Sequence, residues 1–337
     1  MKPSIVIISP ALADANNGNW QTARRWANFL RQQARVSVVR AWDGSPCAAM
    51  IALHARRSAD SIARYAASGS GGLAVVLTGT DLYRDIRSDA HARRSLQLAD
   101  RLVVLQPAGL DELGPSQRAK AVVIMQSAPA LRAGRPRQRT FDLLLVAHLR
   151  AEKDPLTAAR ALARLDDPAL RLVHIGATGD RSGGSADNGG GNTGAEFVAA
   201  AGRDPRIELH GALPHAATRQ LIKRGRILLL PSRMEGGANV IIEAVRSGVP
   251  VIASRIGGSV GLLGADYPGL FPVGDDEALA ELIQRVRQEP GFLAALRQHC
   301  ARRSALFDPE RERDAVRALA HNLLLVHHAS TMEQERQ

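Results

Sequence analysis

One segment of the chain reads Pro231-Ser232-Arg233-Met234-Glu235-Gly236-Gly237-Ala238-Asn239-Val240-Ile241-Ile242-Glu243-Ala244. Apolar runs flank it at residues 227–230 and 249–253, so the pattern predicts a strand, a glycine-containing loop, a helix and a second strand. Glu235 falls in the loop and Glu243 in the helix, with seven residues between them. At a rise of ~1.5 Å per residue, their carboxylates lie up to roughly 12 Å apart.

These two carboxylates predict a site for a nucleotide sugar. Carboxylate oxygens repel a diphosphate but accept hydrogen bonds from hydroxyl groups, so we expect one of them on the sugar and the other on the ribose. A helix N-terminus attracts anions through its unpaired backbone N–H groups. We therefore expect phosphate to bind at the backbone of the residues between the two acids: Gly236, Gly237, Ala238 and Asn239.

Composition limits the class of protein. With 337 residues the chain is long enough for two domains. Hydrophobic residues make up 45% of the sequence but aromatic ones only 4%, so the cores must consist mainly of aliphatic side chains. Cys47 and Cys300 are far apart and match no metal or disulfide spacing. The apolar run at residues 5–8 is too short for a signal peptide, and no run reaches the ~18 residues of a membrane span. We expect a cytoplasmic protein with no membrane partner.

The formal net charge of +11 raises the question of whether the protein binds nucleic acid. The basic residues are mostly arginines spread through predicted helices, and the aromatic residues that would stack on bases are scarce. We therefore expect no nucleic-acid partner, and nucleic-acid binding is the most distant alternative. The positive charge is expected to attract small anions into a cleft.

Strands alternate with helices along the chain, which predicts the α/β class with parallel sheets. Expected strands in the first half are residues 4–8, 36–39, 50–53, 73–77, 102–105 and 121–125, and expected helices are residues 20–33, 58–67 and 91–99. Expected strands in the second half are residues 141–147, 172–176, 207–209, 227–230 and 251–253. Ligands of such sheets bind beyond the carboxyl ends of the strands.

This repetition predicts two Rossmann-like domains facing a central cleft. The expected divisions are residues 1–131 for an acceptor domain, 132–140 for a linker containing Pro and Gly, 141–307 for a donor domain, 308–330 for a helix that packs back on the first domain, and 331–337 for a tail. Residues 181–194 are nearly all small or polar, which indicates a surface insertion.

The second half resembles a known family. Residues 231–243, together with residues 248–253 and Gly257-Gly258, resemble the signature of glycosyltransferase family 4, whose GT-B fold consists of two Rossmann-like domains. Residues 149–155 resemble that family's phosphate-binding turn, and residues 274–279 resemble its late motif. The resemblance implies that Lys153 binds the donor diphosphate and stabilises the leaving group, with Glu235 on the sugar.

One departure concerns the second cation of the diphosphate site. Many members of the family have a Gly-Arg pair where this chain has Ala147-His148. His148 or Arg150 is expected to supply that cation. At the start of the first predicted helix, Asn17 and Gly18 are further candidates for catalysis, because glycine lets the backbone approach a ligand and the helix N-terminus favours anions.

The first half narrows the resemblance. Residues 17–25, 53–58 and 77–85, with residues 126–129 and 148–155, resemble the selenosugar synthase family of selenoneine biosynthesis. This implies transfer from a UDP-sugar, with UDP-N-acetylglucosamine as the expected donor, to selenophosphate. A 1-seleno sugar, UDP and phosphate would be the products, and other enzymes of the pathway are conceivable partners.

The acceptor is expected in the first domain. Selenophosphate is small and already nucleophilic, so the enzyme must position it and balance its charge rather than deprotonate it. Arginine side chains can hold its phosphate through bidentate contacts. The candidate acceptor residues are Asn19, His54, Arg56, Arg57, Thr78, Gly79, Thr80, Asp81 and Arg84. For His54 the alternative is a buried, hydrogen-bonded histidine, and for Asp81 the alternative is a cap of the following turn.

No metal and no cofactor are expected. The sequence lacks an Asp-x-Asp motif at a strand end, and the pairs Asp166-Asp167 and Asp275-Asp276 are expected to cap helices. Two functional alternatives remain open: an ordinary family 4 glycosyltransferase with an oxygen acceptor, and a regulator that binds a nucleotide sugar without turnover. The stereochemistry at the anomeric carbon, the exact sugar and the oligomeric state stay open as well.

Overall fold

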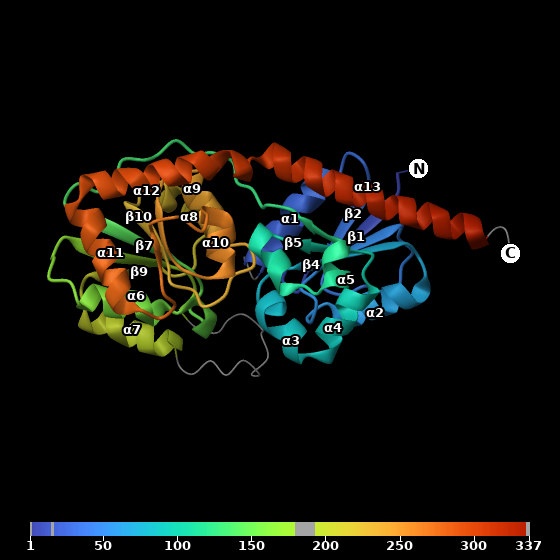
Figure 1. The fold of residues 1–337 in the computed structure, drawn as a ribbon, viewed down its shortest axis with the longest axis horizontal. Coiled ribbons are helices and arrows are strands. Elements are labelled where there is room, and N and C mark those ends of the chain that lie inside the picture. The colour runs from blue at the N-terminus through green and yellow to red at the C-terminus, as the bar shows by residue number, and fades with distance from the viewer. Residues whose placement is uncertain (1, 15–16, 179–192, 335–337) are drawn as a thin grey trace. The chain divides into compact units, whose positions relative to one another are not determined.

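The computed structural model describes residues 2–14, 17–178 and 193–334, with side chains described as far as residue 325. The insertion predicted at residues 181–194 lies outside these residues apart from Thr193 and Gly194, which begin a helix. The chain divides into two compact units (Figure 1). The first unit comprises Met1–Gln126 and Pro309–Gln337, and the second comprises Ser127–Asp308.

The first unit contains a six-stranded parallel sheet with the strand order β2-β1-β3-β4-β5-β6. Its elements are β1 (Ser4–Ile8), α1 (Gly18–Leu30), β2 (Arg35–Val39), β3 (Ala49–Leu53), α2 (Ala59–Ser68), β4 (Gly72–Leu77), the π-helical turn η1 (Asp81–Asp85), α3 (Ile86–Ser88), α4 (Ala90–Leu98), β5 (Arg101–Val104), the 3-10 turn η2 (Pro107–Glu112), α5 (Pro115–Ala119), β6 (Ala121–Val123) and α13 (Pro309–Gln334). From β1 the chain adds β2 on one side and β3 to β6 on the other, so the strand order changes direction between β1 and β3. Parallel sheets of this kind bind ligands at that point.

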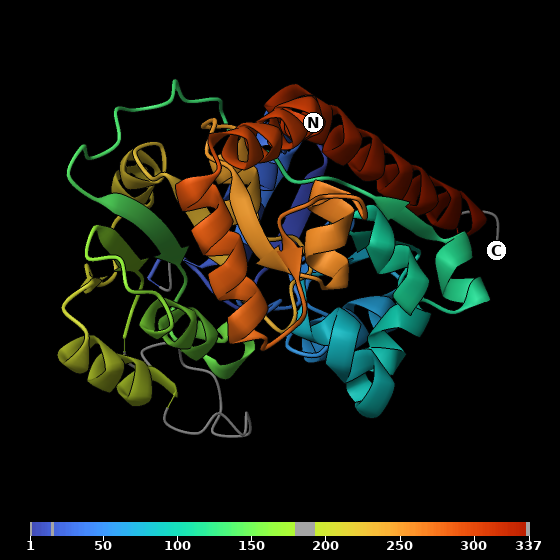
Figure 2. The ribbon, with the colours of Figure 1, turned by 60° about the vertical axis from the view of Figure 1, so that its left-hand side comes forward.

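The second unit has its own six-stranded parallel sheet, in the order β12-β11-β10-β7-β8-β9 (Figure 2). Its elements are β7 (Phe141–Val146), the 3-10 turn η3 (Ala151–Lys153), α6 (Pro155–Ala163), β8 (Leu170–Ile175), α7 (Thr193–Arg203), β9 (Ile207–Leu209), α8 (His215–Ile222), β10 (Ile227–Leu230), α9 (Asn239–Val245), β11 (Val251–Ser254), α10 (Gly257–Leu263), β12 (Leu270–Phe271), α11 (Asp276–Gln288), α12 (Pro290–Arg303) and the 3-10 turn η4 (Ser304–Phe307). This is the Rossmann strand order, with the change of direction between β7 and β10.

Both faces of the first sheet are buried, as its uninterrupted apolar strands predict. Along β1, Ile5 and Ile7 belong to one hydrophobic cluster, while Val6 and Ile8 belong to a second. Successive side chains of a strand point to opposite faces, so this alternation places one cluster on each side of the sheet. The sheet is therefore a rigid layer that fixes the loops at its carboxyl end.

The last helix, α13, completes the first unit. It runs beside α1 (Figure 1), and Val316, Leu319 and Leu323 lie in one of the clusters of that unit. At β4 the backbone of α13 comes so close that a Cβ added to Gly72 would lie 2.4 Å from the carbonyl oxygen of Leu323. The prediction that the last helix packs back on the first domain is confirmed.

A buried carboxylate anchors the N-terminal part of α13. Glu312 is 1% exposed and accepts hydrogen bonds from Trp26 Nε1 at 2.7 Å and from Arg25 Nε and Nη2 at 2.7 and 3.0 Å. Removing one partner of such a buried pair leaves the other charge or polar group without compensation. This fixes the register of α13 along α1.

The predicted strands match the observed ones within a few residues, but two details differ. The two-residue strand β12 was not predicted, because so short a run carries no periodicity. Residues 166–167 cap no helix: Asp167 accepts a hydrogen bond from the Ala169 backbone at 2.8 Å and pairs with Arg287, since Pro168 directs the chain toward β8. Asp275, in contrast, caps α11 through the Ala278 backbone at 2.9 Å, as predicted.

Candidate functional site

In the second unit, the loops that follow β7 and β10 leave the sheet at the point where its strand order changes direction. The loop after β7 carries Lys153, and the loop after β10 carries Glu235. These two loops are therefore the place where the fold itself predicts a ligand.

Lys153 and Glu235, 82 residues apart in sequence, form an ion pair. Lys153 Nζ donates to Glu235 Oε1 at 2.6 Å, and Ser232 Oγ donates to the same oxygen at 2.7 Å. Glu235 is 8% exposed, whereas the Lys153 side chain is 27% exposed. Both donors reach one carboxylate oxygen, so the pair presents an ammonium group and a second carboxylate oxygen at the same edge of the sheet.

Gly258 explains how the Glu235 loop is held. A Cβ at this position would lie 2.1 Å from the carbonyl oxygen of Glu235 and 2.9 Å from its Cβ. Only glycine allows the first turn of α10 to pack against this loop. The Gly257-Gly258 part of the sequence pattern therefore fixes the position of Glu235.

The loop that carries Lys153 is tied to the β10 loop by its neighbours. Asp154 adopts a left-handed conformation with φ 44°, and its carboxylate forms an ion pair with Arg233 Nη2 at 3.0 Å. The Arg233 backbone N–H also donates to the carbonyl of Glu152 at 2.8 Å. Through these contacts Arg233 joins its own loop to the two residues that flank Lys153.

Glu243 has a partner that the sequence analysis did not name. His215 Nε2 lies 2.6 Å from Glu243 Oε1. His215 begins α8 and Glu243 lies within α9, so neighbouring helices supply the pair. No sequence spacing pointed to His215, because the contact depends on how α8 and α9 pack.

The remaining donor-site candidates surround these acids. Gly236 and Gly237 precede α9, Ala238 is its N-cap residue, and Asn239 is its first residue. His148 follows β7, and its Nδ1 accepts a hydrogen bond from the Ala177 backbone at 3.0 Å. Arg150 lies 3.8 Å from Glu152, on the loop that carries Lys153. All these residues lie at the carboxyl ends of β7 and β10.

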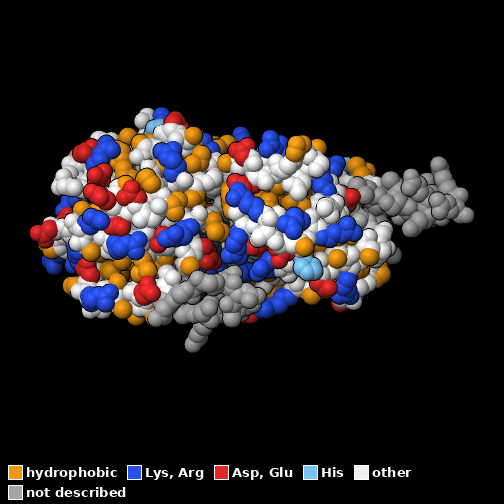
Figure 3. Space-filling model, turned by 60° about the horizontal axis from the view of Figure 1, so that its bottom comes forward, with side chains coloured by type: hydrophobic (Ala, Val, Ile, Leu, Met, Phe, Trp, Pro, Cys, Tyr) orange, Lys and Arg blue, Asp and Glu red, His pale blue; other side chains and the backbone are white. Residues whose placement is uncertain are grey.

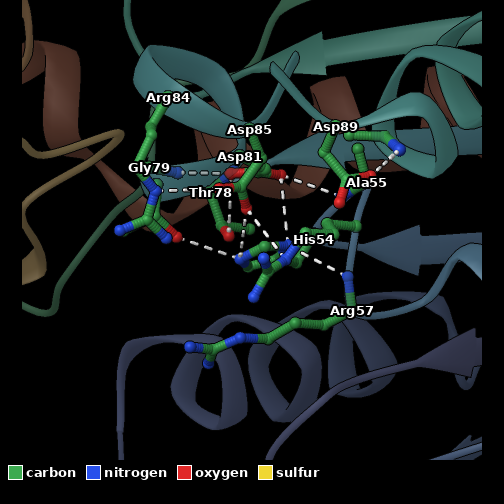
Figure 4. Close-up of polar contacts among 12 residues, drawn as sticks. His54, Ala55, Arg57, Thr78, Gly79, Asp81, Arg84, Asp85 and Asp89 are labelled. Carbon is green, nitrogen blue, oxygen red and sulfur yellow. Dashed lines mark hydrogen bonds and ion pairs between the residues drawn. The ribbon is translucent and has the colours of Figure 1, made fainter. Parts of the chain in front are cut away.

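In the first unit, residues of the loops after β3 and β4 meet around His54 (Figure 4). His54 is 3% exposed and has φ 73°, a conformation that is uncommon for residues other than glycine. Its Nδ1 accepts a hydrogen bond from the Arg57 backbone at 3.3 Å, so a neutral ring carries its proton on Nε2 and donates it to Thr80 Oγ1 at 3.0 Å. Burial lowers the pKa of His54, which favours this neutral form.

Asp81 holds the same loops together. It is fully buried, and its carboxylate accepts hydrogen bonds from the backbone N–H groups of Ala55, Thr78 and Gly79 at 2.8 to 2.9 Å (Figure 4). None of these N–H groups belongs to the turn that follows Asp81, so its expected role as a cap of that turn is wrong: Asp81 instead ties the loop after β3 to the loop after β4. The carboxylate of Asp85, four residues further along η1, is approached by Arg84 Nε at 2.9 Å and by Arg56 Nε at 3.5 Å.

The candidates at the start of α1 make contacts within their own turn. The Asn17 side chain accepts hydrogen bonds from the backbone N–H groups of Asn19 and Trp20 at 3.1 and 3.2 Å. Asn17 is thus the N-cap residue of α1, and Gly18 is the first residue of the helix. The structure brings the candidates of the β3 and β4 loops together around His54 but gives Asn17 a local role.

Three features bear on the expected partners. On the face drawn in Figure 3, Lys and Arg side chains alternate with acidic and apolar ones. Among the described residues, no group of His, Cys, Asp and Glu is arranged to hold a metal ion. Within the same part of the chain, no helix is both long and apolar enough to cross a membrane.

Comparison with known structures supports the fold. HepE of Anabaena, solved in complex with UDP and glucose, superposes with a TM-score of 0.75 over 95% of this chain and 100% of its own, at 16% identity. Sucrose-phosphate synthase from Thermosynechococcus elongatus gives the same TM-score and identity over 95% of this chain and 99% of its own. The predicted fold class, two Rossmann-like α/β units of the GT-B type, is confirmed.

Sequence comparison agrees. The chain is 31% identical over 101 residues to D-inositol 3-phosphate glycosyltransferase 1 of Catenulispora acidiphila, covering 28% of this chain and 24% of that protein. It is 31% identical over 140 residues to 2-deoxystreptamine N-acetyl-D-glucosaminyltransferase of Streptomyces fradiae, covering 41% of this chain and 29% of that protein. The chain thus spans about a quarter of the length of these relatives. Residues 130–305, just over half of the chain, match the model of the glycosyl transferases group 1 family, and the chain therefore belongs to that family.

Proposed function

We propose that this protein transfers a glycosyl group from a UDP-sugar, with UDP-N-acetylglucosamine as donor, to selenophosphate. The observation that carries the donor half of the proposal is the Lys153–Glu235 pair at the change of strand direction, with Glu243 at the same edge of the sheet. A solved relative of the same fold contains UDP and glucose, and a sequence relative is named an N-acetyl-D-glucosaminyltransferase.

In this proposal each of the donor-site residues of the second unit has one role in the reaction. Lys153 stabilises the charge that develops on the leaving UDP, and His148 or Arg150 assists it. Preorganised cations in a partly buried site are effective at this because they need not reorient during the reaction. Glu235 accepts a hydrogen bond from the sugar, and Glu243 accepts one from the ribose. We expect this set of groups to support turnover without an added metal ion.

The acceptor half of the proposal is supported by the cations of the first unit. Three guanidinium groups, from Arg56, Arg57 and Arg84, accompany two carboxylates, Asp81 and Asp85, so these five side chains together carry one net positive charge. Arginine suits a tetrahedral oxyanion because its planar N–H groups can donate two hydrogen bonds at once. A small, multiply charged acceptor fits this environment better than an apolar one does.

The proposed reaction has two bond changes at selenium. A selenium lone pair attacks C1 of the sugar, the bond from C1 to the diphosphate oxygen breaks, and UDP leaves with that electron pair. The immediate product is a sugar whose selenium still carries the phosphoryl group. Water then cleaves the selenium–phosphorus bond, which releases inorganic phosphate and the 1-seleno sugar.

The test is direct. Purified protein is incubated with UDP-N-acetylglucosamine and selenophosphate, with and without a metal chelator, while UDP is quantified and the sugar product is identified by mass spectrometry. Inorganic phosphate, thiophosphate and no acceptor are the controls. UDP release that depends on selenophosphate, with selenium in the sugar product, is the expected result. Binding of the UDP-sugar without such turnover would contradict the selenium acceptor and favour a hydroxyl acceptor.

A matched pair of variants tests the role of Lys153. Lys153→Met is expected to lower kcat/KM about 100-fold, the effect of removing one group that stabilises developing charge. Lys223→Met, in the same unit but at the end of α8, is the control and should leave kcat/KM unchanged. Equal activity of the two variants would contradict the proposed role.

A further inference from the structure

Asp85 occupies an unusual position in the first unit. It is 2% exposed and is the last residue of η1, the π-helical turn that follows β4 (Figure 4). Its Oδ1 accepts a hydrogen bond from Arg84 Nε at 2.9 Å, and its Oδ2 lies 3.5 Å from Arg56 Nε. One buried carboxylate therefore lies against the guanidinium groups of two different loops.

Both arginines approach Asp85 through Nε, the guanidinium nitrogen nearest the main chain. Each guanidinium also carries two terminal NH2 groups. The side chains of Arg56 and Arg84 are 32% and 41% exposed, in contrast to 3% for Asp85. This arrangement fixes the inner end of each guanidinium group, and the partial exposure of both side chains brings the outer end within reach of a ligand from solvent.

The second carboxylate oxygen of Asp85, Oδ2, depends on positive charge close to it. Among the described residues Oδ2 has no hydrogen-bond partner, although it is buried. Arg56 Nε lies 3.5 Å from it, and Nε2 of the neutral His54 ring lies at 4.0 Å but donates its proton to Thr80. A buried carboxylate oxygen without a hydrogen bond is costly unless nearby positive charge compensates it. Arg56 provides that charge, so Asp85 constrains Arg56 as much as Arg56 stabilises Asp85.

We propose that Asp85 is a positioning residue that holds Arg56 and Arg84 as the binding groups of a subsite for phosphate-type dianions. This inference rests on the proposed function in that selenophosphate is the ligand of the subsite during turnover. Asp85 itself does not touch the ligand: as a carboxylate it would repel a dianion, and its burial behind the two arginines keeps it away. Thr80 adds a hydroxyl donor, because the oxygen accepts the proton of His54 and its own proton is left to donate.

The chain offers a matched control. Asp276, in the second unit, also holds two arginines: Arg160 Nε at 3.1 Å and Arg164 Nε at 2.5 Å. It begins α11 of the second unit, whereas the loops after β3 and β4 belong to the first, and its side chain is 17% exposed. Asp85→Asn and Asp276→Asn therefore make the same chemical change to the same kind of Arg–Asp–Arg group.

Steady-state kinetics with both substrates tests the proposal. Asp85→Asn is expected to raise the KM for selenophosphate at least tenfold, with kcat within about threefold and the KM for the UDP-sugar unchanged; thermal unfolding monitors the fold. Asp276→Asn should change none of these constants. An Asp85→Asn variant that is folded and has an unchanged KM for selenophosphate overturns the proposal. If Asp85→Asn does not fold, Arg84→Met, at an exposed side chain, must raise the same KM, and an unchanged value overturns the proposal.

A binding measurement separates this inference from the proposed reaction. Isothermal titration with inorganic phosphate and thiophosphate, without any UDP-sugar, reports the subsite even if no selenosugar forms. Binding by the wild type that is weakened by Asp85→Asn but not by Asp276→Asn supports the subsite whether or not turnover occurs. Absence of binding of both phosphate and thiophosphate to the wild type overturns the subsite, even if the protein proves to transfer sugar to another acceptor.

Discussion

The two units place acidic side chains at the carboxyl ends of their sheets, but in different surroundings. In the second unit, Glu235 and Glu243 meet the side chains of Lys153 and His215, each through one carboxylate oxygen at 2.6 Å. In the first unit, Asp81 accepts three backbone N–H groups with its two oxygens. The carboxylates of Glu235 and Glu243 are thus paired with side chains, whereas that of Asp81 is paired with the backbone.

This difference separates ligand binding from support. A lysine or histidine side chain can rotate away when a sugar or ribose hydroxyl replaces it, and the carboxylate then keeps a partner. Backbone N–H groups cannot move without opening the loop, and a buried N–H that loses its acceptor carries the full cost of desolvation. We therefore expect Glu235 and Glu243 to bind ligand and Asp81 to fix the loops whose cations bind it.

The largest effect should come from Asp81→Ala. Three backbone N–H groups would lose a charged acceptor, and since hydrogen bonds to charged groups contribute about 1.5–3 kcal/mol each and are not additive, the free energy of unfolding should fall by about 3–5 kcal/mol. Urea unfolding measures this change. Asp81→Asn keeps one oxygen acceptor and should lose less. A decrease below about 1 kcal/mol for Asp81→Ala would remove the contrast between the two units.

Glu235→Ala tests the ligand-binding role proposed for the acid in the second unit. It should lower kcat/KM by the equivalent of about 1.5–3 kcal/mol, from one lost charged hydrogen bond to the sugar. Its free energy of unfolding should change far less than that of Asp81→Ala, because the Lys153 side chain is 27% exposed and reaches water once the acid is gone. Kinetics and urea unfolding on the same preparations provide the comparison. Unchanged kinetics in this variant would refute the proposed sugar contact.

Gly72→Ala should destabilise the first unit by about 1–3 kcal/mol, the usual cost of overpacking. The added Cβ would meet the backbone of α13 at Leu323, which cannot yield as a flexible side chain does. Gly202→Ala in α7 is the control: nothing lies within 4 Å of its added Cβ, and the change should stabilise by roughly 0.5–1 kcal/mol. Equal unfolding midpoints for the two variants would contradict the close packing of α13.

His215→Ala should have a smaller effect on the donor site. Loss of the partner of Glu243 should raise the KM for the UDP-sugar severalfold, in line with about 0.5–1.5 kcal/mol for one hydrogen bond. His210→Ala removes a similar pair, with Glu208 at 3.4 Å, on the exposed surface of the same unit. The His210 variant should keep the wild-type KM. A shift of the same size in both variants would argue against a specific role of His215.

The smallest expected effect is on the pH dependence of the free energy of unfolding. Here the two units should behave alike, because each contains a buried histidine. Burial lowers the pKa of His54 in the first unit and of His174 in the second below 6.5. Between the lowered pKa and 6.5 the unfolded chain binds more protons than the folded one, so stability is fully present above pH 6.5 and is lost as the pH falls through the folded pKa. Urea unfolding at pH 7.5 and 5.5 should show the loss, and His54→Gln and His174→Gln should each reduce it. If neither variant reduces the loss of stability between pH 7.5 and 5.5, other titrating groups cause it.

Much of this architecture could be predicted from the sequence because buried parallel strands are nearly continuous apolar runs. Such runs located the strands, and the position of Lys153 and Glu235 just after two of them located the donor candidates. A local pattern such as Gly257-Gly258 was also readable, and Gly258 proves to touch the backbone of Glu235.

The partners of those residues could not be predicted in the same way. His215 lies 28 residues from Glu243, on a helix whose orientation no periodicity specifies. Ser232 was part of the quoted segment, yet nothing in its spacing showed that it would donate to Glu235. Asp85 had one signal: it lies four residues after Asp81, and the π-helical turn between them was needed to bring both carboxylates to His54.

The route of the chain has a consequence for biosynthesis. The first unit is discontinuous, and the whole of Ser127–Asp308 must be translated before α13 can be made. At about 5–20 residues per second, roughly 10–40 s separate the completion of β6 from the emergence of the helix that covers one face of its sheet. During that interval the apolar surface opposite Gly72 and around Trp26 is open. The second unit, continuous in sequence, can fold in the meantime, so the domain that is begun first on the ribosome is the one that is finished last.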